Sequence, residues 1–223
     1  LEQHEMLGVR YVQRARELGR PDLVILPGTK NTMEDLLWLR QNGLEAATLK
    51  LAHAGTPILG VCGGYQMLGQ TLDDPQGTES GRPMALSGLG LLPTRTVFDA
   101  QKRRMQVRAA AQGELFGGAR LTGYEIHNGR TEVGGAPFCV LEDGTPEGCV
   151  NRNVFGTYLH GLFDSGELTG ALVRMLCARK GISPTPTQLM SMADYRQQQF
   201  DLLADGVRQA LDMGAVYRAI NTA

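Results

Sequence analysis

The residue with the most distinctive chemical setting is Cys62, which lies among glycines in the segment LGVCGGYQMLG, residues 59–69. The apolar run TPILGV before it predicts a buried strand, and YQMLGQTL after it has the apolar spacing of a helix. A strand, a sharp turn and a helix form a nucleophile elbow, whose strained central residue needs small neighbours. Because the helix start directs free N–H groups at the sulfur, we expect a lowered pKa for the Cys62 thiol. The N–H of Gly63 is then a candidate oxyanion donor.

The same glycine-rich turn has an alternative reading as a phosphate cradle. The fuller spacings GxxxxGK[ST] and GxGxxG are both absent around Cys62, which disfavours that alternative. The other cysteines, Cys139, Cys149 and Cys177, lie in strand-like or helix-like stretches and are predicted to be buried structural thiols. Without a CxxC pair or a histidine at ligand spacing, the cysteines predict neither a zinc site nor a disulfide framework.

A nucleophilic cysteine needs a base, and the chain has four histidines. His4 in the charged lead-in and His53 in a helical stretch are expected at the surface or at a helix end. His127 and His160 both follow short strand-like runs. His160 is the better base, because VFGTYLHG alternates and then stops at Gly161, which places the imidazole at a strand end, where open α/β sheets keep their sites.

The rest of the chain predicts an α/β fold that can hold this pair. DLVILPG reads as a buried strand, and the following helix starts at Asn31 or Thr32 and stops at Gly43. Strands and helices alternate up to Cys62, as in an open, mostly parallel sheet flanked by helices. The middle of the chain shifts to turn-rich alternating strands, an antiparallel excursion. We expect one domain over residues 1–180 and a helical C-terminal extension over residues 181–223, packed on or beside it.

The charge composition of the chain indicates which kinds of binding partner to expect. The 223 residues include 22 Lys and Arg against 23 Asp and Glu, a net charge of -1 without blocks of like charge. This predicts no nucleic-acid partner and no membrane surface, and it favours a small neutral or zwitterionic substrate. No apolar run reaches membrane length, so a soluble, cytoplasmic protein is expected. The chain starts at Leu1 rather than Met, so we expect it to be part of a longer protein.

These segments together resemble a known family. GVCGGYQ is similar to the G-x-C-x-G-x-Q motif of class I glutamine amidotransferases. With LPGTKNTMEDLLWLR, GLGLLPTRT, GYEIHNGRT and GTYLHGLFD in this order, the chain resembles the C-terminal amidotransferase domain of the cobyric acid synthase family over most of residues 22–175. The resemblance implies a flavodoxin-like fold and hydrolysis of glutamine.

The resemblance also implies roles for single residues. Cys62 attacks the side-chain amide of glutamine and forms a thioester, while His160 gives a proton to the leaving ammonia. The loop at Gly28 and Thr29 forms the oxyanion side opposite Gly63, and Gln66 helps to hold the substrate. His127 and Asn128 are expected at the rim of the pocket, or they only shape a turn.

One position departs from the amidotransferase pattern. Many class I members have a glutamate two residues after the histidine, and Leu162 stands there in this chain. The third member of the triad is therefore unassigned, and Asp164 and Glu125 are the candidates by motif proximity.

In the family that the chain resembles, ammonia passes to an N-terminal synthetase domain that uses ATP and Mg to amidate corrin carboxylates. No P-loop is present here, so this synthetase domain is expected on sequence absent from the chain. No cofactor and no metal are expected in the amidotransferase domain itself. The alternatives are an amidotransferase for another ligase, acting on cobyrinate or a peptidoglycan precursor, a cysteine hydrolase such as a peptidase, or a non-catalytic partner domain.

Overall fold

The strands expected before Gly28 and before Cys62 lie side by side in a computed structural model of the chain, which describes residues 1–2, 4–113, 116–164, 166–184 and 192–221. They are β1 (Val24–Leu26) and β2 (Ile58–Val61), and β2 also pairs in parallel with β10 (Val154–Thr157). The antiparallel β9 (Cys149–Asn151) completes a four-stranded sheet in the order β1-β2-β10-β9. This sheet is the mostly parallel one that the sequence predicts.

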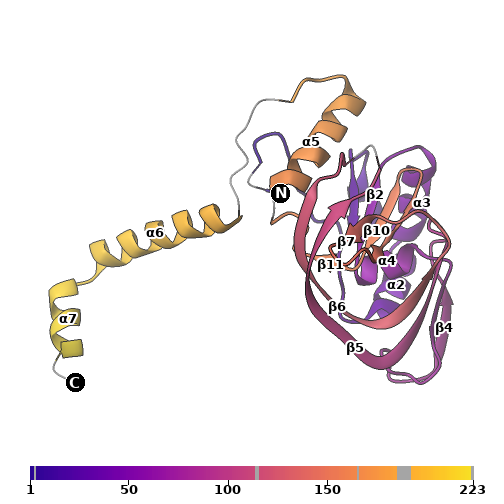
Figure 1. The fold of residues 1–223 in the computed structure, drawn as a ribbon, viewed down its shortest axis with the longest axis horizontal. Helices are drawn as coiled ribbons and strands as arrows, with labels where there is room; N and C mark the ends of the chain where they lie inside the picture. The colour runs from indigo at the N-terminus through magenta and orange to yellow at the C-terminus, as the bar shows by residue number, and fades with distance from the viewer. Residues whose placement is uncertain (3, 114–115, 165, 185–191, 222–223) are drawn as a thin grey trace. The chain divides into compact units, whose positions relative to one another are not determined.

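The antiparallel excursion predicted for the middle of the chain belongs to a second, seven-stranded sheet, in which one pair of strands is parallel and the other pairs are antiparallel. Its central pair is β5 (Thr94–Ala111) and β6 (Arg120–Val133), two long strands that run side by side and curve together in Figure 1. Its other strands are β3 (Thr71–Asp74), β4 (Met84–Ser87), β7 (Cys139–Leu141), β8 (Pro146–Glu147) and β11 (Leu159–His160). Because β11 follows β10 almost directly but pairs with β6, residues 158–160 join the two sheets.

The helices in the described ranges include the one predicted after Gly28, with its start and stop signals. They are α1 (Ala15–Leu18), α2 (Thr32–Gln41), α3 (Leu44–His53), α4 (Gly63–Leu68), α5 (Gly166–Lys180), α6 (Met192–Ala210) and α7 (Met213–Asn221). The side chain of Asn31 caps α2 by accepting the N–H of Glu34 at 3.2 Å. Gly43 ends the α2 region with a φ of 70°, a left-handed conformation that glycine adopts without strain. None of these helices has both the length and the apolar character that a membrane crossing needs.

The chain divides into two compact units, Leu1–Thr187 and Gln188–Ala223. The second unit consists of α6 and α7 in the part that the structure describes, drawn in yellow in Figure 1. The helical character expected of the C-terminal extension is thus present, and its packing against the first unit stays a prediction.

Two apolar clusters hold the first unit together. One cluster lies between the parallel sheet and the helices α2 and α4, and includes Leu26, Ile58, Met33, Leu36 and Leu68. The other joins the antiparallel sheet to the start of α5, and includes Leu121, Phe138, Phe155, Leu159 and Leu168. The strands β2 and β10 contribute to both clusters, so both halves of the unit pack against this pair of strands.

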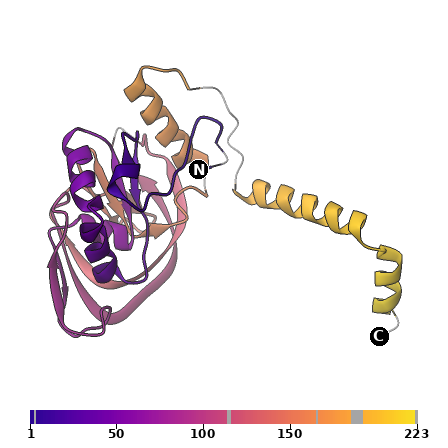
Figure 2. The same ribbon diagram turned by 180° about the vertical axis from the view of Figure 1, so that it is seen from behind.

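The lead-in residues pack on α5, which makes the expectation of a surface position for His4 wrong. Leu1 and Leu7 contact the apolar side of α5, and Figure 2 shows the N-terminal segment beside this helix. His4 between them is only 6% exposed, and its Nδ1 accepts the N–H of Met6 at 3.2 Å. His53, by contrast, is exposed at the end of α3, as predicted.

Helix α4 lies so close to β1 that its second residue has no room for a side chain. A Cβ placed on Gly64 would lie 2.1 Å from the carbonyl oxygen of Leu26 and 2.8 Å from the Leu26 Cβ. Both are backbone or near-backbone atoms, which cannot rotate away. The position of α4, and therefore of Cys62 before it, depends on this contact.

We expect Gly64→Ala to lower the free energy of unfolding by about 3 kcal/mol, because the added methyl pushes α4 away from β1. Urea denaturation followed by circular dichroism measures the change. Gly8→Ala is the matched control, since a Cβ there meets nothing within 4 Å, and it should change stability by less than about 0.5 kcal/mol. Equal stability of the two variants would contradict the close contact.

Candidate active site

Cys62 occupies a strained turn between β2 and α4. Its φ of 51° and ψ of −111° lie outside the regions that residues with a Cβ normally adopt. Among the described non-glycine residues, only Cys62 and Arg152 have a positive φ. Two hydrogen bonds of its own backbone hold the turn: Cys62 N–H donates to the Thr157 carbonyl at 2.8 Å, and its carbonyl accepts from the Gln66 N–H at 3.0 Å. The elbow geometry predicted from the sequence is present, and strain of this kind is typical of functional sites.

The thiol of Cys62 is nearly buried, with 8% of the residue exposed, and it donates to the carbonyl of Ile126 at 3.5 Å. Burial raises the pKa of this thiol to about 11. The Gly63 N–H lowers the pKa and the negative charge of Glu79 raises it, and both effects are smaller than that of burial. The expectation of a lowered pKa is therefore wrong for the ligand-free chain, because desolvation outweighs the start of a six-residue helix.

His160 lies on β11, directly opposite Tyr124 on β6. The two rings are stacked with centroids 5.1 Å apart and an angle of 8° between their planes. A ring N–H donates to the Ile126 carbonyl, the same group that the Cys62 thiol contacts. Burial is the larger influence and lowers the pKa of His160, so the imidazole is neutral at pH 7 and able to accept a proton.

Gly28 lies between the two proposed reacting groups. A Cβ placed on Gly28 would lie 3.4 Å from the Cβ of Cys62 and 3.1 Å from the Cε1 of His160. Gly63 is similarly close to the same loop: a Cβ there would lie 2.3 Å from Thr29 Cγ2 and 3.2 Å from the Thr29 nitrogen. The structure thus brings together Gly28, Thr29 and Gly63, which stay predicted members of the oxyanion hole.

Gln66 is buried in α4, with 2% of the residue exposed. Its Oε1 accepts the hydroxyl of Thr32 at 2.9 Å, and its Nε2 donates to the Asn128 carbonyl at 3.1 Å and to the Tyr158 hydroxyl at 3.2 Å. These bonds tie α4 to α2, β6 and the segment after β10. Whether Gln66 also holds the substrate, as the family resemblance implies, stays a prediction.

The two predicted rim residues face different neighbours. The His127 ring stacks on Tyr158 with centroids 3.6 Å apart, and its Nδ1 is 3.1 Å from the Gly129 carbonyl. Both His127 and Tyr158 line a cavity of about 510 Å³. Among the described residues, Cys62 and His160 do not line this cavity. The Oδ1 of Asn128 is buried and accepts no hydrogen bond in the part of the chain that the structure describes.

The two carboxylates proposed as the third triad member lie in different places relative to the His160 ring. On the paired strands β6 and β11, Glu125 is opposite Leu159, and Tyr124 is opposite His160. Successive side chains of a strand point to opposite faces of the sheet. Glu125 therefore points to the face away from the imidazole. Asp164 lies in the turn after β11, where its N–H donates to the Gly161 carbonyl at 2.9 Å. The Ile126 carbonyl is a hydrogen-bond partner of the His160 ring, a main-chain group that no sequence motif reveals, and the third member of the triad stays a prediction.

Glu147 on β8 is a buried carboxylate that sequence reasoning missed. It accepts the Thr157 hydroxyl and the Tyr158 N–H at 2.6 Å each, and the Cys139 thiol at 3.3 Å. Burial raises its pKa. The bonds to Thr157 and Tyr158 fix the segment that leads into His160. The carbonyl of Thr157 in this segment accepts the Cys62 N–H. No local pattern marks Glu147, because its partners become neighbours only when β8 and β10 pack together.

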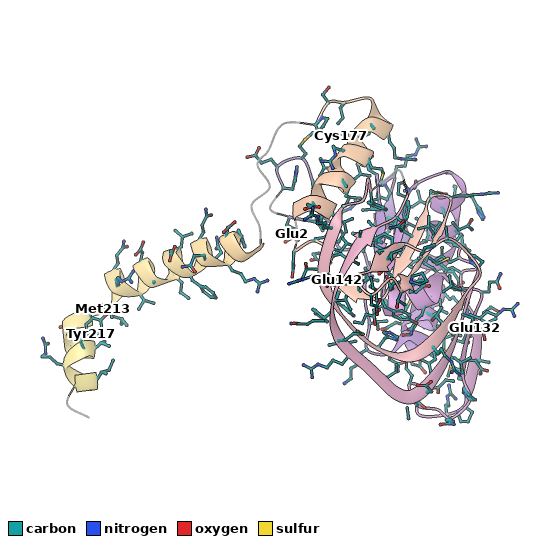
Figure 3. All side chains as sticks on the ribbon, in the orientation of Figure 1. Glu2, Glu132, Glu142, Cys177, Met213 and Tyr217 are labelled. Atoms are coloured by element: carbon teal, nitrogen blue, oxygen red, sulfur yellow. The ribbon has the colours of Figure 1, made fainter. Side chains whose placement is uncertain are left out.

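The remaining chemistry-bearing groups form no second centre in the described ranges. Cys139, Cys149 and Cys177 are free and buried, as predicted, and Cys177 lies on α5, where Figure 3 labels it. No group of three or more His, Cys, Asp or Glu side chains among the described residues is arranged to hold a metal ion.

Comparison with known proteins identifies relatives over nearly the whole chain. Residues 1–168 match the model of the CobB/CobQ-like glutamine amidotransferase domain. The chain is 44% identical over 225 residues to cobyric acid synthase of Streptococcus sanguinis, covering 96% of the chain and 44% of that protein. It is 46% identical over 222 residues to cobyric acid synthase of Salmonella arizonae, covering 94% of the chain and 43% of that protein. The chain therefore spans less than half the length of these curated relatives.

Solved structures confirm the fold class. A crystal structure of a glutamine amidotransferase superposes with a TM-score of 0.54 at 18% identity, covering 79% of this chain and 88% of that one. The structure of PurLQS from Thermotoga maritima has a TM-score of 0.50 at 18% identity and covers 70% of this chain and 80% of that one. At such low identity the likeness concerns the fold alone.

We expect alkylation of Cys62 by iodoacetamide in the ligand-free chain to accelerate roughly tenfold for each pH unit between neutral pH and its pKa of about 11. The reason is that only the thiolate reacts, and burial keeps its fraction small. Mass spectrometry of the Cys62 peptide measures the rate, with Cys62→Ala as the blank. A rate already constant at neutral pH would show a thiolate of low pKa and contradict this account.

Thr157→Val removes the hydroxyl that donates to Glu147 and accepts from the Leu159 N–H at 3.0 Å, at a fully buried position. We expect a loss of about 1–3 kcal/mol in the free energy of unfolding, because buried partners are left unsatisfied. Thermal or urea denaturation gives the value. Thr122→Val on the exposed side of β6 is the matched control and should leave the free energy of unfolding unchanged. An unchanged free energy of unfolding in Thr157→Val would show that the bond to Glu147 does not stabilise this segment.

Proposed function

Because the chain belongs to the CobB/CobQ-like glutamine amidotransferase family, we propose that it hydrolyses glutamine at Cys62 and supplies the ammonia to an ATP-dependent ligase. The observation that carries the proposal is the meeting of Cys62 and His160 at one carbonyl, that of Ile126, with Gly28 against both side chains. This arrangement brings together a thiol, a neutral imidazole and Gly28, a residue without a side chain.

The first half-reaction forms a thioester. The Cys62 thiol is protonated at neutral pH, so its proton passes to the neutral His160 as the sulfur attacks the amide carbon of glutamine. The negative charge that develops on the amide oxygen is stabilised by the N–H groups of Thr29 and Gly63. The carbon–nitrogen bond then breaks, and the imidazolium of His160 gives its proton to the departing ammonia.

The second half-reaction regenerates the thiol. His160, neutral again, accepts a proton from a water molecule that attacks the thioester carbon. The carbon–sulfur bond breaks, the sulfur recovers a proton from His160, and glutamate leaves. The stack with Tyr124 and the bond to Ile126 keep the imidazole in one orientation through both steps.

The partner follows from the relatives. The curated relatives named cobyric acid synthase are more than twice as long as the stretch they share with this chain. We propose that the ammonia passes to a synthetase part of the same kind, which uses ATP and Mg to amidate carboxylates of a corrin in the cytoplasm. The amidotransferase chain itself needs neither ATP nor Mg, since its chemistry consists of nucleophilic attack and proton transfer at Cys62 and His160.

The test is release of glutamate from glutamine by this chain, alone and with the synthetase part of a cobyric acid synthase added. We expect Cys62→Ala to abolish release and His160→Ala to lower it by at least roughly 100-fold, because each removes a group that the first half-reaction needs. Cys177→Ala is the matched control, since this buried thiol on α5 takes no part. Glutamate release that survives in Cys62→Ala, or its absence from the folded wild type under both conditions, would overturn the proposal.

A further inference from the structure

The second unit of the chain, which starts at Gln188, exposes many large apolar side chains. Seven of the fifteen exposed large hydrophobic residues among the described ones belong to this unit, although it is much the shorter of the two. Apolar residues that gather on a surface mark interaction sites, whereas single exposed ones need no explanation. The seven, with exposed fractions between 40% and 65%, are Phe200, Leu202, Leu203, Val207, Leu211, Tyr217 and Ile220.

Four of these side chains share one face of α6. Phe200, Leu203, Val207 and Leu211 follow one another at intervals of three and four residues, the spacing of one helix face. The N–H of Leu211 still donates to the Val207 carbonyl, at 3.0 Å. We call these four residues the apolar stripe. Leu202, two residues after Phe200, lies on the opposite side, because two residues make rather more than half a turn of helix.

The apolar stripe needs a partner, because α6 has little intrinsic support as a helix. Gly206 and the β-branched Val207 in its interior lower its helix propensity. Most of the stability of a helix in a protein comes from burial of its apolar face. An exposed stripe of this kind therefore favours a surface that covers it.

The charges of α6 favour a protein over a membrane as this partner. The helix has three Asp against two Arg and no Lys. Two of its carboxylates are paired within the helix: Arg208 donates to Asp205 at 2.9 Å, and Gln197 donates to Asp201 at 3.0 Å. Amphipathic helices that lie on anionic lipid surfaces instead have a polar face rich in Lys and Arg.

The relatives indicate which protein covers the stripe. The model of the amidotransferase domain matches residues 1–168 and ends before α6. The matches to the two cobyric acid synthases cover 96% and 94% of the chain, so they include most of the second unit. The segment that carries the apolar stripe therefore has a counterpart in whole synthases, which are more than twice as long as the matched stretch.

We propose that the apolar stripe of α6 docks in an apolar groove on the synthetase part of the ligase. The inference rests on the proposed function, in which that part receives the ammonia. Anchors at intervals of three and four residues are those by which an amphipathic helix binds in a groove. The contact joins the glutamine-hydrolysing unit to the synthetase part through a surface outside the active site, so ammonia is released within the assembly that consumes it.

The experiment measures binding of this chain to the synthetase part of the Streptococcus sanguinis cobyric acid synthase, the stretch that the chain does not match. Calorimetric titration without glutamine gives the Kd, and circular dichroism and ATP binding check that the synthetase part is folded. Leu203→Ser should weaken binding by roughly 10- to 100-fold, because it removes a central apolar anchor. Hydrogen exchange in α6 of the wild type should slow when the complex forms.

Leu202→Ser is the matched control. It makes the same change one residue away, at a side chain that is 65% exposed where Leu203 is 63% exposed, but on the opposite side of α6. It should bind within about threefold of the wild type. Both positions are exposed, so neither change should affect the fold, and the helix content measured by circular dichroism checks this.

Three results would overturn the docking site: a wild type that does not bind, a Leu203→Ser variant that binds as well as the wild type, or equal weakening by both substitutions. A wild-type chain that dimerises in analytical ultracentrifugation, and that Leu203→Ser makes monomeric, would assign the stripe to a second copy instead. Since binding is measured without glutamine, glutamate release without binding contradicts the docking site alone. Binding without glutamate release contradicts the proposed glutamine hydrolysis alone.

Discussion

The contact of α4 with the end of β1 is the constraint on which the site depends. With the Gly64 backbone against the Leu26 carbonyl, the chain has a single residue, Cys62, in which to change from strand β2 to helix α4. Cys62 therefore has a positive φ, and a hydrogen bond from its N–H to the Thr157 carbonyl of β10 stabilises this conformation. The strain at Cys62 is offset by the packing of α4 against β1, β2, β5 and β10, and the strained turn presents the thiol at the end of the parallel sheet.

The electrostatics of the ligand-free site favour neutral groups. Burial raises the pKa of Cys62 and lowers that of His160, so a protonated thiol and a neutral imidazole face one carbonyl at neutral pH. Such a pair reacts only when an electrophile allows the proton to move from sulfur to nitrogen during attack. A resting thiol of this kind avoids unproductive alkylation and oxidation, which both require the thiolate. The same burial that opposes the charged forms strengthens every hydrogen bond to the developing oxyanion.

Each of the two sheets positions some of the residues of the candidate site. The parallel sheet supplies Gly28 and Cys62 at the ends of β1 and β2, whereas the antiparallel sheet supplies the Ile126 carbonyl and the partner strand of His160. Residues 158–160 join them, and the buried Glu147 fixes the start of this junction by accepting the Thr157 hydroxyl and the Tyr158 N–H. The hydrogen bond from His160 to the Ile126 carbonyl fixes the ring through a main-chain group, which substitution of a side chain does not remove.

The sequence by itself determined the elements and the chemistry of the nucleophile, because these depend on neighbours along the chain: the strand before Cys62, its small flanking residues, the Asn31 cap and the strand end at His160. It also carried the resemblance to a glutamine amidotransferase family, and the comparisons confirm that family. It left undetermined the size of the antiparallel sheet, the burial of His4, the raised pKa of Cys62 and the positions of Glu79, Ile126 and Glu147. Each of these arises from groups that are distant in sequence and meet only on packing. Desolvation and long-range hydrogen bonds are properties of the tertiary structure, which alone decided them.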